Sequence, residues 1–184
     1  MTRISAGRWR GRRLVTPKGD ATRPTAEKVR AAIGNALAAT GGLDGSAVLD
    51  LYAGSGALGL ELASRGAARV VLVERDRAAQ AAIRANIEHL AAGSAVLVPG
   101  DAAAFARMPG EAFDIVVADP PYTETSEMLA TLLADLYRSG RLRPAADVVV
   151  ERAARDGELA WPEPLVPVRA RRYGDTLVCY GRAP

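Results

Sequence analysis

Residues 50–59 read DLYAGSGALG, and they join an apolar run, Ala47–Leu51, to a segment with helical periodicity, Leu58–Ser64. The three glycines allow the backbone to turn tightly and to come close to a ligand, while the start of the following helix presents unpaired N–H groups. A glycine-rich turn between a buried strand and a helix is typical of Rossmann-like α/β domains. The segment therefore predicts a domain that binds a cofactor containing adenosine.

Strands and helices alternate on both sides of this turn. An earlier helix is expected, with Thr25 as its N-cap, a buried stripe that includes Val29 and Ile33, and Gly41-Gly42 as its end. Further strands are expected at Arg69–Glu74, Ala95–Val98, Phe113–Asp119, Asp147–Glu151, Val166–Arg171 and Thr176–Gly181, and further helices at Ala78–Leu90, Ala102–Arg107 and Glu124–Leu136. This order predicts a mostly parallel sheet of seven strands with helices on both faces and an antiparallel C-terminal pair at one edge.

The composition excludes several classes of protein. With 184 residues, 49% of them apolar and 24% charged, the chain fits one globular domain with a small appendage. No apolar run reaches the ~18 residues that span a bilayer, and the N-terminus lacks the apolar region of a secretory signal. Because Cys179 and His89 are the only residues of their kinds, we expect no disulfide, no metal site and a cytoplasmic location. We also expect a monomer.

The N-terminus carries most of the positive charge. Residues 1–30 hold nine basic and two acidic side chains, a local charge of +7, so the remaining 154 residues carry −4. Trp9, Gly7 and Gly11 are interleaved with the arginines, which favours a basic β-hairpin arm over a solvated tail. We expect this arm at 1–22, the cofactor-binding α/β domain at 23–184, and phosphate contacts from the arm. Trp9 is expected to pack within the arm.

Acidic residues beside the glycine turn discriminate between adenosine cofactors. Glu74 ends the second strand, where a carboxylate can accept both hydroxyls of a ribose, but nicotinamide enzymes share this acid. Asp50 suits the cationic amino acid end of S-adenosylmethionine (SAM) and disfavours a pyrophosphate. Asp101 can accept the exocyclic N–H of adenine and can also cap the next helix, and the two roles are compatible. These acids favour SAM, with the expected cofactor contacts Asp50, Tyr52, Ala53, Gly54, Ser55, Gly56, Glu74, Arg75, Asp101 and Ala102.

The tetrapeptide Asp119-Pro120-Pro121-Tyr122 ends the fourth strand. An aryl amine is a poor nucleophile because its lone pair is delocalised into the ring. The Asp119 carboxylate and the Pro120 carbonyl would accept its two protons, localise the lone pair and stabilise the positive charge that develops. The prolines hold that carbonyl in place, and Tyr122 offers a face for stacking. An ordinary proline turn is the alternative, but four residues in this order and place indicate methyl transfer to a planar amine, with Asp119, Pro120 and Tyr122 as the acting residues.

These motifs make the chain similar to the RsmD family, the guanine-N2 methyltransferases of bacterial 16S ribosomal RNA. The resemblance covers nearly the whole chain and includes Arg3–Gly7, Arg10–Arg12, Arg23–Thr25, Lys28–Arg30, Leu49–Glu61, Ser64–Ala67, Val73-Glu74, Asn86, Asp119–Tyr122 and Tyr173–Thr176, with Glu27 and Gly34-Asn35 as departures. It implies a class I SAM-dependent methyltransferase fold, N2-methylguanosine as the product, and the small ribosomal subunit or an assembly intermediate as the partner. The expected substrate contacts are Arg8, Arg10, Arg12, Arg23, Thr25, Lys28, Arg30 and Tyr173.

Other readings keep part of this pattern. The tetrapeptide also suits an amino-methyltransferase that acts on adenine or cytosine in DNA or on a protein glutamine, although the arm argues against these. Two features argue against a nicotinamide-dependent oxidoreductase. The chain lacks a Tyr/Lys or His pair suited to hydride transfer, and the charge of Asp50 would be unfavourable beside a pyrophosphate. A non-catalytic RNA-binding module would have no need of the intact tetrapeptide. Deletion of residues 1–20 is expected to weaken RNA binding without changing SAM affinity.

Overall fold

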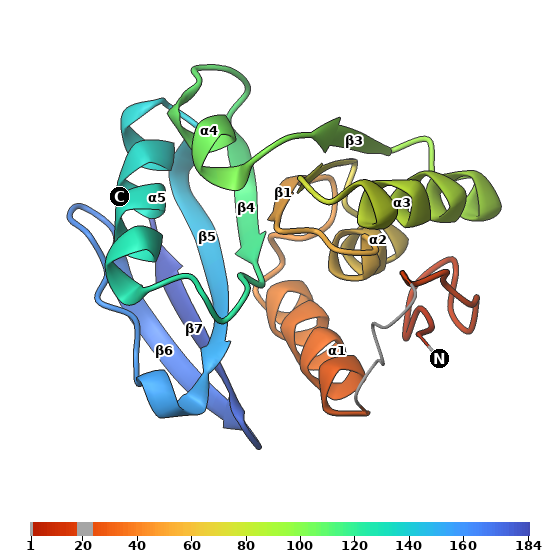
Figure 1. Ribbon diagram of the computed structural model, residues 1–184, viewed down its shortest axis with the longest axis horizontal. Helices are drawn as coiled ribbons and strands as arrows, with labels where there is room; N and C mark the ends of the chain where they lie inside the picture. Colours follow the sequence, from red (N-terminus) through yellow and green to blue (C-terminus); the bar gives the residue numbers. More distant parts are fainter. Residues whose placement is uncertain (1, 18–23) are drawn as a thin grey trace.

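A computed structural model describes residues 2–17 and 24–184, so the expected substrate contact Arg23 lies outside the described residues. The helices are α1 (Pro24–Ala39), α2 (Ala57–Ser64), α3 (Arg77–Leu90), α4 (Ala102–Arg107), α5 (Ser126–Arg138) and the 3-10 turn η1 (Ala154–Asp156). The strands are β1 (Ala47–Leu51), β2 (Arg69–Glu74), β3 (Ala95–Pro99), β4 (Phe113–Ala118), β5 (Leu142–Ala153), β6 (Val166–Tyr173) and β7 (Thr176–Arg182). Figure 1 shows their arrangement.

The described strands form one seven-stranded sheet in the order β3-β2-β1-β4-β5-β7-β6. The first five strands in this order are parallel, and β7 runs antiparallel to both β5 and β6. This confirms the mostly parallel α/β fold and the antiparallel pair predicted from the sequence. The strand order reverses between β1 and β4, and ligands of open α/β sheets bind beyond the carboxyl ends of the strands at such a point.

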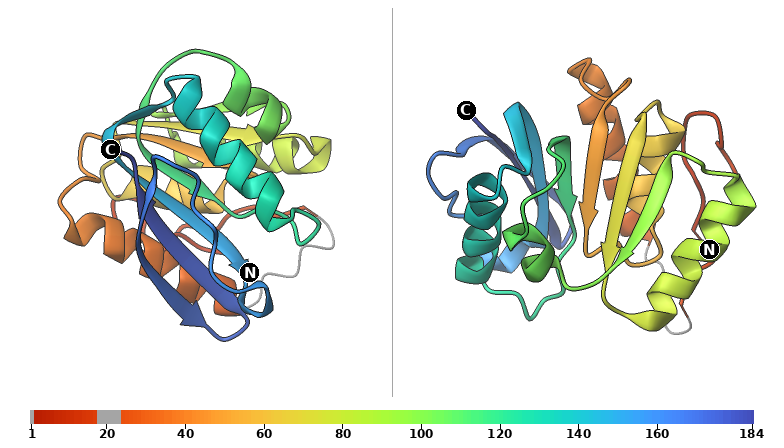
Figure 2. Two further views of the ribbon diagram at one scale, coloured as in Figure 1. Left: turned by 90° about the vertical axis from the view of Figure 1, so that its left-hand side faces the viewer. Right: turned by 90° about the horizontal axis from the view of Figure 1, so that it is seen from above.

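Neighbouring residues of the strands point into two separate cores. Val48 of β1 packs with apolar residues of α1, α2 and α3, whereas Leu49 packs with α4 and α5. Helices therefore cover both faces of the sheet (Figure 2). Since both faces are buried, the central strands are continuous apolar runs instead of alternating ones.

Most element boundaries lie within two residues of the prediction, and two of the differences have a clear physical cause. The helix α1 begins at Pro24, so Thr25 lies inside the helix and is not its N-cap. Proline is favoured in the first turn because its missing N–H would have no partner there. The strand β5 starts at Leu142, five residues before the apolar run at Asp147, because Leu142 pairs with Phe113 of β4. This pairing extends the strand through a polar segment that has no strand pattern of its own.

Residues 2–17 form a turn-rich loop and not a regular β-hairpin. One antiparallel bridge joins Arg3 to Arg13, and the Ile4 amide donates to the Arg12 carbonyl at 3.0 Å. Three apolar side chains of this loop are buried in the core shared with α1, α2 and α3, namely Ile4, Trp9 and Leu14. Trp9 is thus a packing residue, as predicted. We call residues 2–17 the N-terminal loop from here on.

The N-terminal loop is also hydrogen-bonded to α2. The buried Glu61 carboxylate accepts hydrogen bonds from the backbone amides of Ser5 at 2.7 Å and Ala6 at 3.1 Å. The Ser64 carbonyl accepts another from the Arg8 amide at 2.8 Å. The amides of Ser5, Ala6 and Arg8 thus donate to α2, whereas those of Ile4 and Leu14 donate to carbonyls within the loop. Among the described residues, no helix is both long and apolar enough to span a membrane.

Candidate cofactor and catalytic site

The glycine turn adopts backbone angles that favour glycine. Gly54 and Gly56 have φ of 57° and 78°, in the left-handed region. Gly59 lies one turn into α2, where an added Cβ would come within 2.4 Å of the Leu72 side chain and 2.9 Å of the Asp50 carboxylate. The first two glycines thus shape the turn, and the third lets α2 pack against β2, as expected for this motif.

Glu74 holds the glycine turn in place from the end of β2. One carboxylate oxygen accepts the Gly54 amide at 2.8 Å, and the other accepts the Asp76 amide at 2.7 Å. Each carboxylate oxygen has two lone pairs, so both remain able to accept a ligand hydroxyl. Glu74 can therefore order the turn and bind a ribose at the same time.

A cavity of about 380 Å³ lies between the glycine turn and the end of β4, and it has the size of a small-molecule site. It is lined by Tyr52, Gly54, Val73, Glu74, Arg75, Gly100, Ala102, Asp119 and Pro121. Five of the residues that the sequence assigns to the cofactor are in this lining. The lining fits an adenosine cofactor because the Glu74 carboxylate lies beside the glycine turn. The space next to Gly54 is open, since a Cβ added there would have no atom within 4 Å.

Some expected cofactor contacts have other roles in this structure. The Asp50 side chain is buried behind the turn, where its carboxylate accepts the Gly59 amide at 2.8 Å, and it does not line the cavity. Burial raises the pKa of Asp50 to about 8, with the Asp119 and Glu74 charges adding to the effect. Asp101 caps α4 by accepting the Ala104 amide at 2.9 Å. Ala53, Ser55 and Gly56 shape the turn without lining the cavity.

The tetrapeptide lies at the carboxyl end of β4, as predicted. Asp119 and Pro121 line the cavity together with Gly54 and Glu74. The Tyr122 ring is 69% exposed, and the Arg155 guanidinium lies 5.7 Å from its centroid. An exposed ring beside the cavity can accept a planar substrate, and its guanidinium neighbour favours bases or phosphates.

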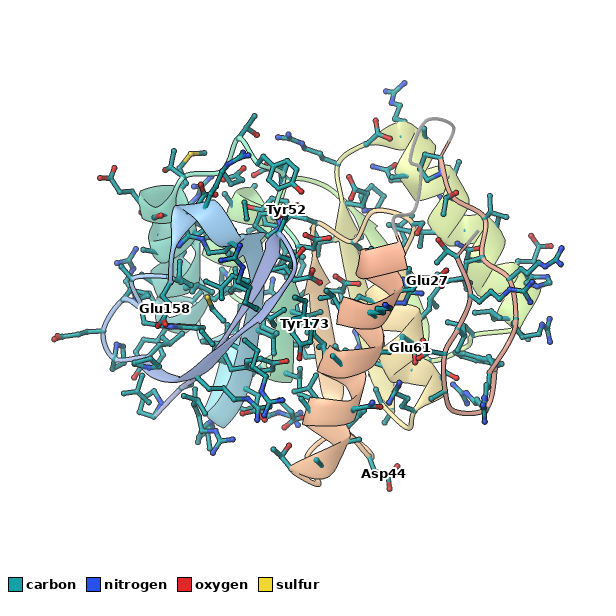
Figure 3. All side chains as sticks on the ribbon, turned by 90° about the horizontal axis from the view of Figure 1, so that it is seen from below. Glu27, Asp44, Tyr52, Glu61, Glu158 and Tyr173 are labelled. Carbon is teal, nitrogen blue, oxygen red and sulfur yellow. The ribbon has the colours of Figure 1, made fainter. Side chains whose placement is uncertain are left out.

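The structure separates the expected substrate contacts into two groups. Arg8 donates to the Ser94 hydroxyl before β3, and Arg12 donates to the His89 carbonyl in the last turn of α3. These contacts place Arg8 and Arg12, with the exposed Arg10 between them in the chain, at the amino edge of the sheet, opposite the tetrapeptide. Tyr173 and the first turns of α1, which contain the exposed Lys28, lie at the carboxyl edge of the sheet. Figure 3 labels Tyr173, which lies beside α1, and also Tyr52 and Glu61; Glu61 lies on the side of the N-terminal loop.

Arg30 is a structural contact in this state. Its side chain is 8% exposed, its guanidinium donates to the Arg3 carbonyl at 2.8 Å, and its Nε lies 4.0 Å from the Glu61 carboxylate. An exposed phosphate contact was expected here. The charge of Glu61 and the packing of α1 on the sheet bury Arg30 instead.

Sequence analysis assigned no role to Glu61 or Glu151, and it named Asn86 only as part of the family resemblance. Glu61 is fully buried and also accepts from the Ser5 hydroxyl at 2.6 Å and the Arg65 guanidinium at 2.7 Å. Glu151, near the carboxyl end of β5, interacts electrostatically with Asp119. Asn86 of α3 joins the Val15 backbone to the Ser55 carbonyl of the glycine turn, at 2.7 to 2.9 Å. A charged residue within an otherwise apolar helix or strand is the only signal that marks the first two.

Comparison with known proteins agrees with this architecture. The family model described as conserved hypothetical protein 95 matches residues 2–182. The chain is 39% identical over 156 residues to ribosomal RNA small subunit methyltransferase D of Escherichia coli strain K12, covering 84% of this chain and 76% of that protein. The chain belongs to the RsmD family.

Other members of the RsmD family support the assignment along the whole chain. The protein of the same name from Haemophilus influenzae is 33% identical over 166 residues, which are 88% of this chain and 83% of that protein. The solved structure of the methyltransferase yhhF of Escherichia coli superposes with a TM-score of 0.87 at 34% identity, covering 100% of this chain and 98% of that one. This RsmD-family chain is therefore a methyltransferase, which rules out the oxidoreductase and non-catalytic alternatives.

Proposed function

We propose that this protein transfers a methyl group from SAM to the exocyclic N2 amine of a guanine in 16S ribosomal RNA, with the small subunit or an assembly intermediate as its partner. The RsmD relatives named as small-subunit rRNA methyltransferases support the RNA substrate. We further propose that it acts in the cytoplasm as a monomer. Among the described residues, no group of three or more His, Cys, Asp or Glu side chains is arranged to hold a metal ion.

One observation carries the proposal: residues of the glycine turn and of the tetrapeptide line the same cavity. Glu74 and Gly54 would hold the adenosine part of SAM, and Tyr52 and Ala102 would close its sides. Burial and the nearby charges of Glu124 and Asp101 raise the pKa of Tyr52, so its hydroxyl stays protonated and can donate. SAM supplies an electrophilic methyl group on a sulfonium. The cavity would direct it toward Asp119.

The acceptor side is formed by the end of β4. The Asp119 carboxylate and the Pro120 carbonyl would accept the two N–H groups of the amine, so that its lone pair points at the cavity. The same two oxygens would stabilise the positive charge that develops on nitrogen as its bond to the methyl group forms and the bond from that methyl group to sulfur breaks. S-adenosylhomocysteine would leave as a neutral thioether, and one N–H proton would pass to the Asp119 carboxylate or to water. Tyr122 would hold the base by stacking after it has left its helix. Alignment of nitrogen with the methyl group supplies much of the rate.

The phosphate contacts are divided between the two edges of the sheet. We propose that Lys28 contacts RNA near the site and that Arg8, Arg10 and Arg12 contact it near the amino edge. A five-residue strand such as β1 spans about 17 Å, so the RNA would extend at least this far over the protein. Folded rRNA in a subunit offers phosphates over such a distance, whereas a single flexible nucleotide does not.

The deciding experiment incubates the enzyme with labelled SAM and with small subunits that lack the modification, followed by nucleoside analysis of the 16S rRNA. The expected product is N2-methylguanosine. Free 16S rRNA, double-stranded DNA and total protein serve as parallel acceptors. Label in adenine, in cytosine or in glutamine would assign the enzyme to one of the alternative substrates and overturn the proposal.

A further inference from the structure

Three carboxylate-bearing residues lie at the carboxyl edge of adjacent strands. In the register of the sheet, Leu51 pairs with Ala118, and Ala118 pairs with Val150. Asp119 directly follows Ala118, and Glu151 directly follows Val150, so the two are neighbours on the same face of β4 and β5. The Asp50 side chain lies on that face of β1 as well, since its carboxylate meets Gly59 of α2.

The surroundings of Glu151 contain unsatisfied polar groups. Arg30 of α1 and Tyr180 of β7 both interact electrostatically with the Glu151 carboxylate. Arg30 and Tyr180 are 7% and 6% exposed, yet the Arg30 Nε and the Tyr180 hydroxyl are buried without a hydrogen-bond partner. Most buried polar groups in proteins are paired. The Arg30 Nε still has the Glu61 carboxylate at 4.0 Å, so the Tyr180 hydroxyl is the buried group near Glu151 that a polar ligand could complete.

Glu151 also lies beside the tetrapeptide. It lines a small recess together with Pro120, Tyr122 and Glu124. The SAM cavity, by contrast, is lined by Asp119 and Pro121 but not by Glu151. Glu151 is therefore the neighbour of Asp119 and is not in the lining of the proposed SAM site, which is the position expected of a residue that recognises the target base.

The ligand that suits two adjacent carboxylates is one with two adjacent donors. The Watson–Crick edge of guanine carries N1–H next to the N2 amine, so both groups donate. Adenine and cytosine present a ring nitrogen lone pair next to their amine, and a carboxylate repels such a lone pair. An isolated Asp119 would accept from any of the three amines, so selection of guanine needs a second acceptor.

We propose that Glu151 selects guanine by accepting its N1–H, while Asp119 accepts one N2–H. This inference rests on the proposed N2-guanine function and names the residue that makes the choice. A carboxylate that accepts N1–H must be ionised when the base binds. Burial raises the pKa of Glu151 well above its usual range, with contributions from the Asp119 and Asp50 charges and a smaller opposing effect of Arg30. The guanine donors would favour the ionised form again.

The test compares two target bases with wild-type enzyme and Glu151→Gln. Small subunits are assembled from 16S rRNA that carries either guanine or 2-aminopurine at the methylated position. 2-Aminopurine keeps the amine but has a lone pair at N1. We expect wild-type kcat/KM to be about 10- to 100-fold lower for 2-aminopurine, the effect of one hydrogen bond to a charged group. Glu151→Gln should lose activity on guanine and gain relative activity on 2-aminopurine, because its amide can donate to N1.

Matched measurements separate selection from structural damage. Glu158→Gln changes an exposed glutamate beyond β5 and should behave like wild type. SAM affinity and the midpoint of thermal unfolding should be unchanged in Glu151→Gln. The wild-type kcat/KM for guanine should rise with pH as Glu151 ionises, next to Asp119, Asp50, Arg30 and Tyr180, and this rise should be absent in Glu151→Gln.

The outcomes are distinct. A shift of at least 10-fold in the guanine to 2-aminopurine ratio supports the role of Glu151. An equal loss on both bases, or an unchanged ratio, overturns it while leaving the N2-guanine function intact. A wild-type enzyme that places no methyl group on N2 of guanine would instead contradict the proposed function itself.

Discussion

The Glu74 carboxylate accepts the backbone amide of Gly54 at 2.8 Å, across 20 residues of sequence. Glu74 ends β2, and Gly54 lies in the turn that follows β1, so the bond joins the ends of two paired strands. It ties the conformation of the turn to the acid that is expected to bind the ribose. The two parts of the proposed cofactor site are thus ordered as one unit.

Removing this carboxylate should weaken SAM binding. We expect Glu74→Ala to lower the SAM affinity by about 10- to 100-fold, because a charge-assisted hydrogen bond and the order of the turn are lost together. Glu74→Gln retains an acceptor for Gly54 and should fall between this variant and wild type. Calorimetric titration with SAM measures both, with the exposed Glu88→Ala as control. Equal affinity in all four proteins would remove Glu74 from the site.

Substitution of Asp119 should affect transfer more than SAM binding. Asp119→Ala is expected to lower kcat by about 10² to 10³, the usual effect of losing one group that stabilises developing charge. Asp119→Asn keeps one acceptor oxygen and should retain more activity than the alanine variant. Single-turnover methyl transfer and SAM titration distinguish the two steps. Loss of SAM binding in Asp119→Asn would place this residue on the cofactor side instead.

Glu61 should be a main determinant of stability. Its fully buried carboxylate accepts from Ser5, Ala6 and Arg65 and faces Arg30. We expect Glu61→Ala to lower the free energy of unfolding by about 3–5 kcal/mol, since it leaves buried cations and amides without their partner. Urea denaturation measures this loss, and exposed Glu127→Ala should cost far less. Similar losses in the two variants would contradict the network.

Deletion of residues 1–20 should also unfold the protein in part. The sequence alone predicts that this truncation weakens only RNA binding. Ile4, Trp9 and Leu14 belong to the main core, however, and burying each such side chain stabilises a protein by about 1.5–3 kcal/mol. Arg10→Ala is therefore the better probe of RNA contact, because Arg10 is exposed. It should weaken rRNA association, lessen its salt dependence and leave the unfolding midpoint unchanged.

Asp50 should make stability depend on pH. Its pKa of about 8 in the folded state exceeds that of an unfolded aspartate, so the folded protein binds more protons between about pH 4 and pH 8. The free energy of unfolding should therefore fall as pH rises through this window, by at most about 1.4 kcal/mol per pH unit from this group. Asp50→Asn keeps an acceptor for Gly59 and should flatten that part of the curve. Denaturation at several pH values measures it, and identical curves would refute the assignment.

Local patterns of the sequence were sufficient to predict the fold and the position of the candidate site. The apolar run before Gly54, the acid at Glu74 and the tetrapeptide at Asp119 each depend on residues adjacent in the chain. Strand, turn and helix are local structures, so their order and the carboxyl-edge position of these motifs follow from neighbours in sequence. The family resemblance, which includes the N-terminal residues, predicted that the substrate is ribosomal RNA.

Tertiary structure alone decided which charges are buried and which edge they occupy. Arg30 and Arg10 look alike in the sequence, yet one is buried beside Glu61 and the other is exposed at the far edge of the sheet. Asp119 and Glu151 are separated by helix α5, and only the register of β4 and β5 makes them neighbours. Electrostatic interaction depends on distance and burial, and neither can be read from residues that are far apart in the chain.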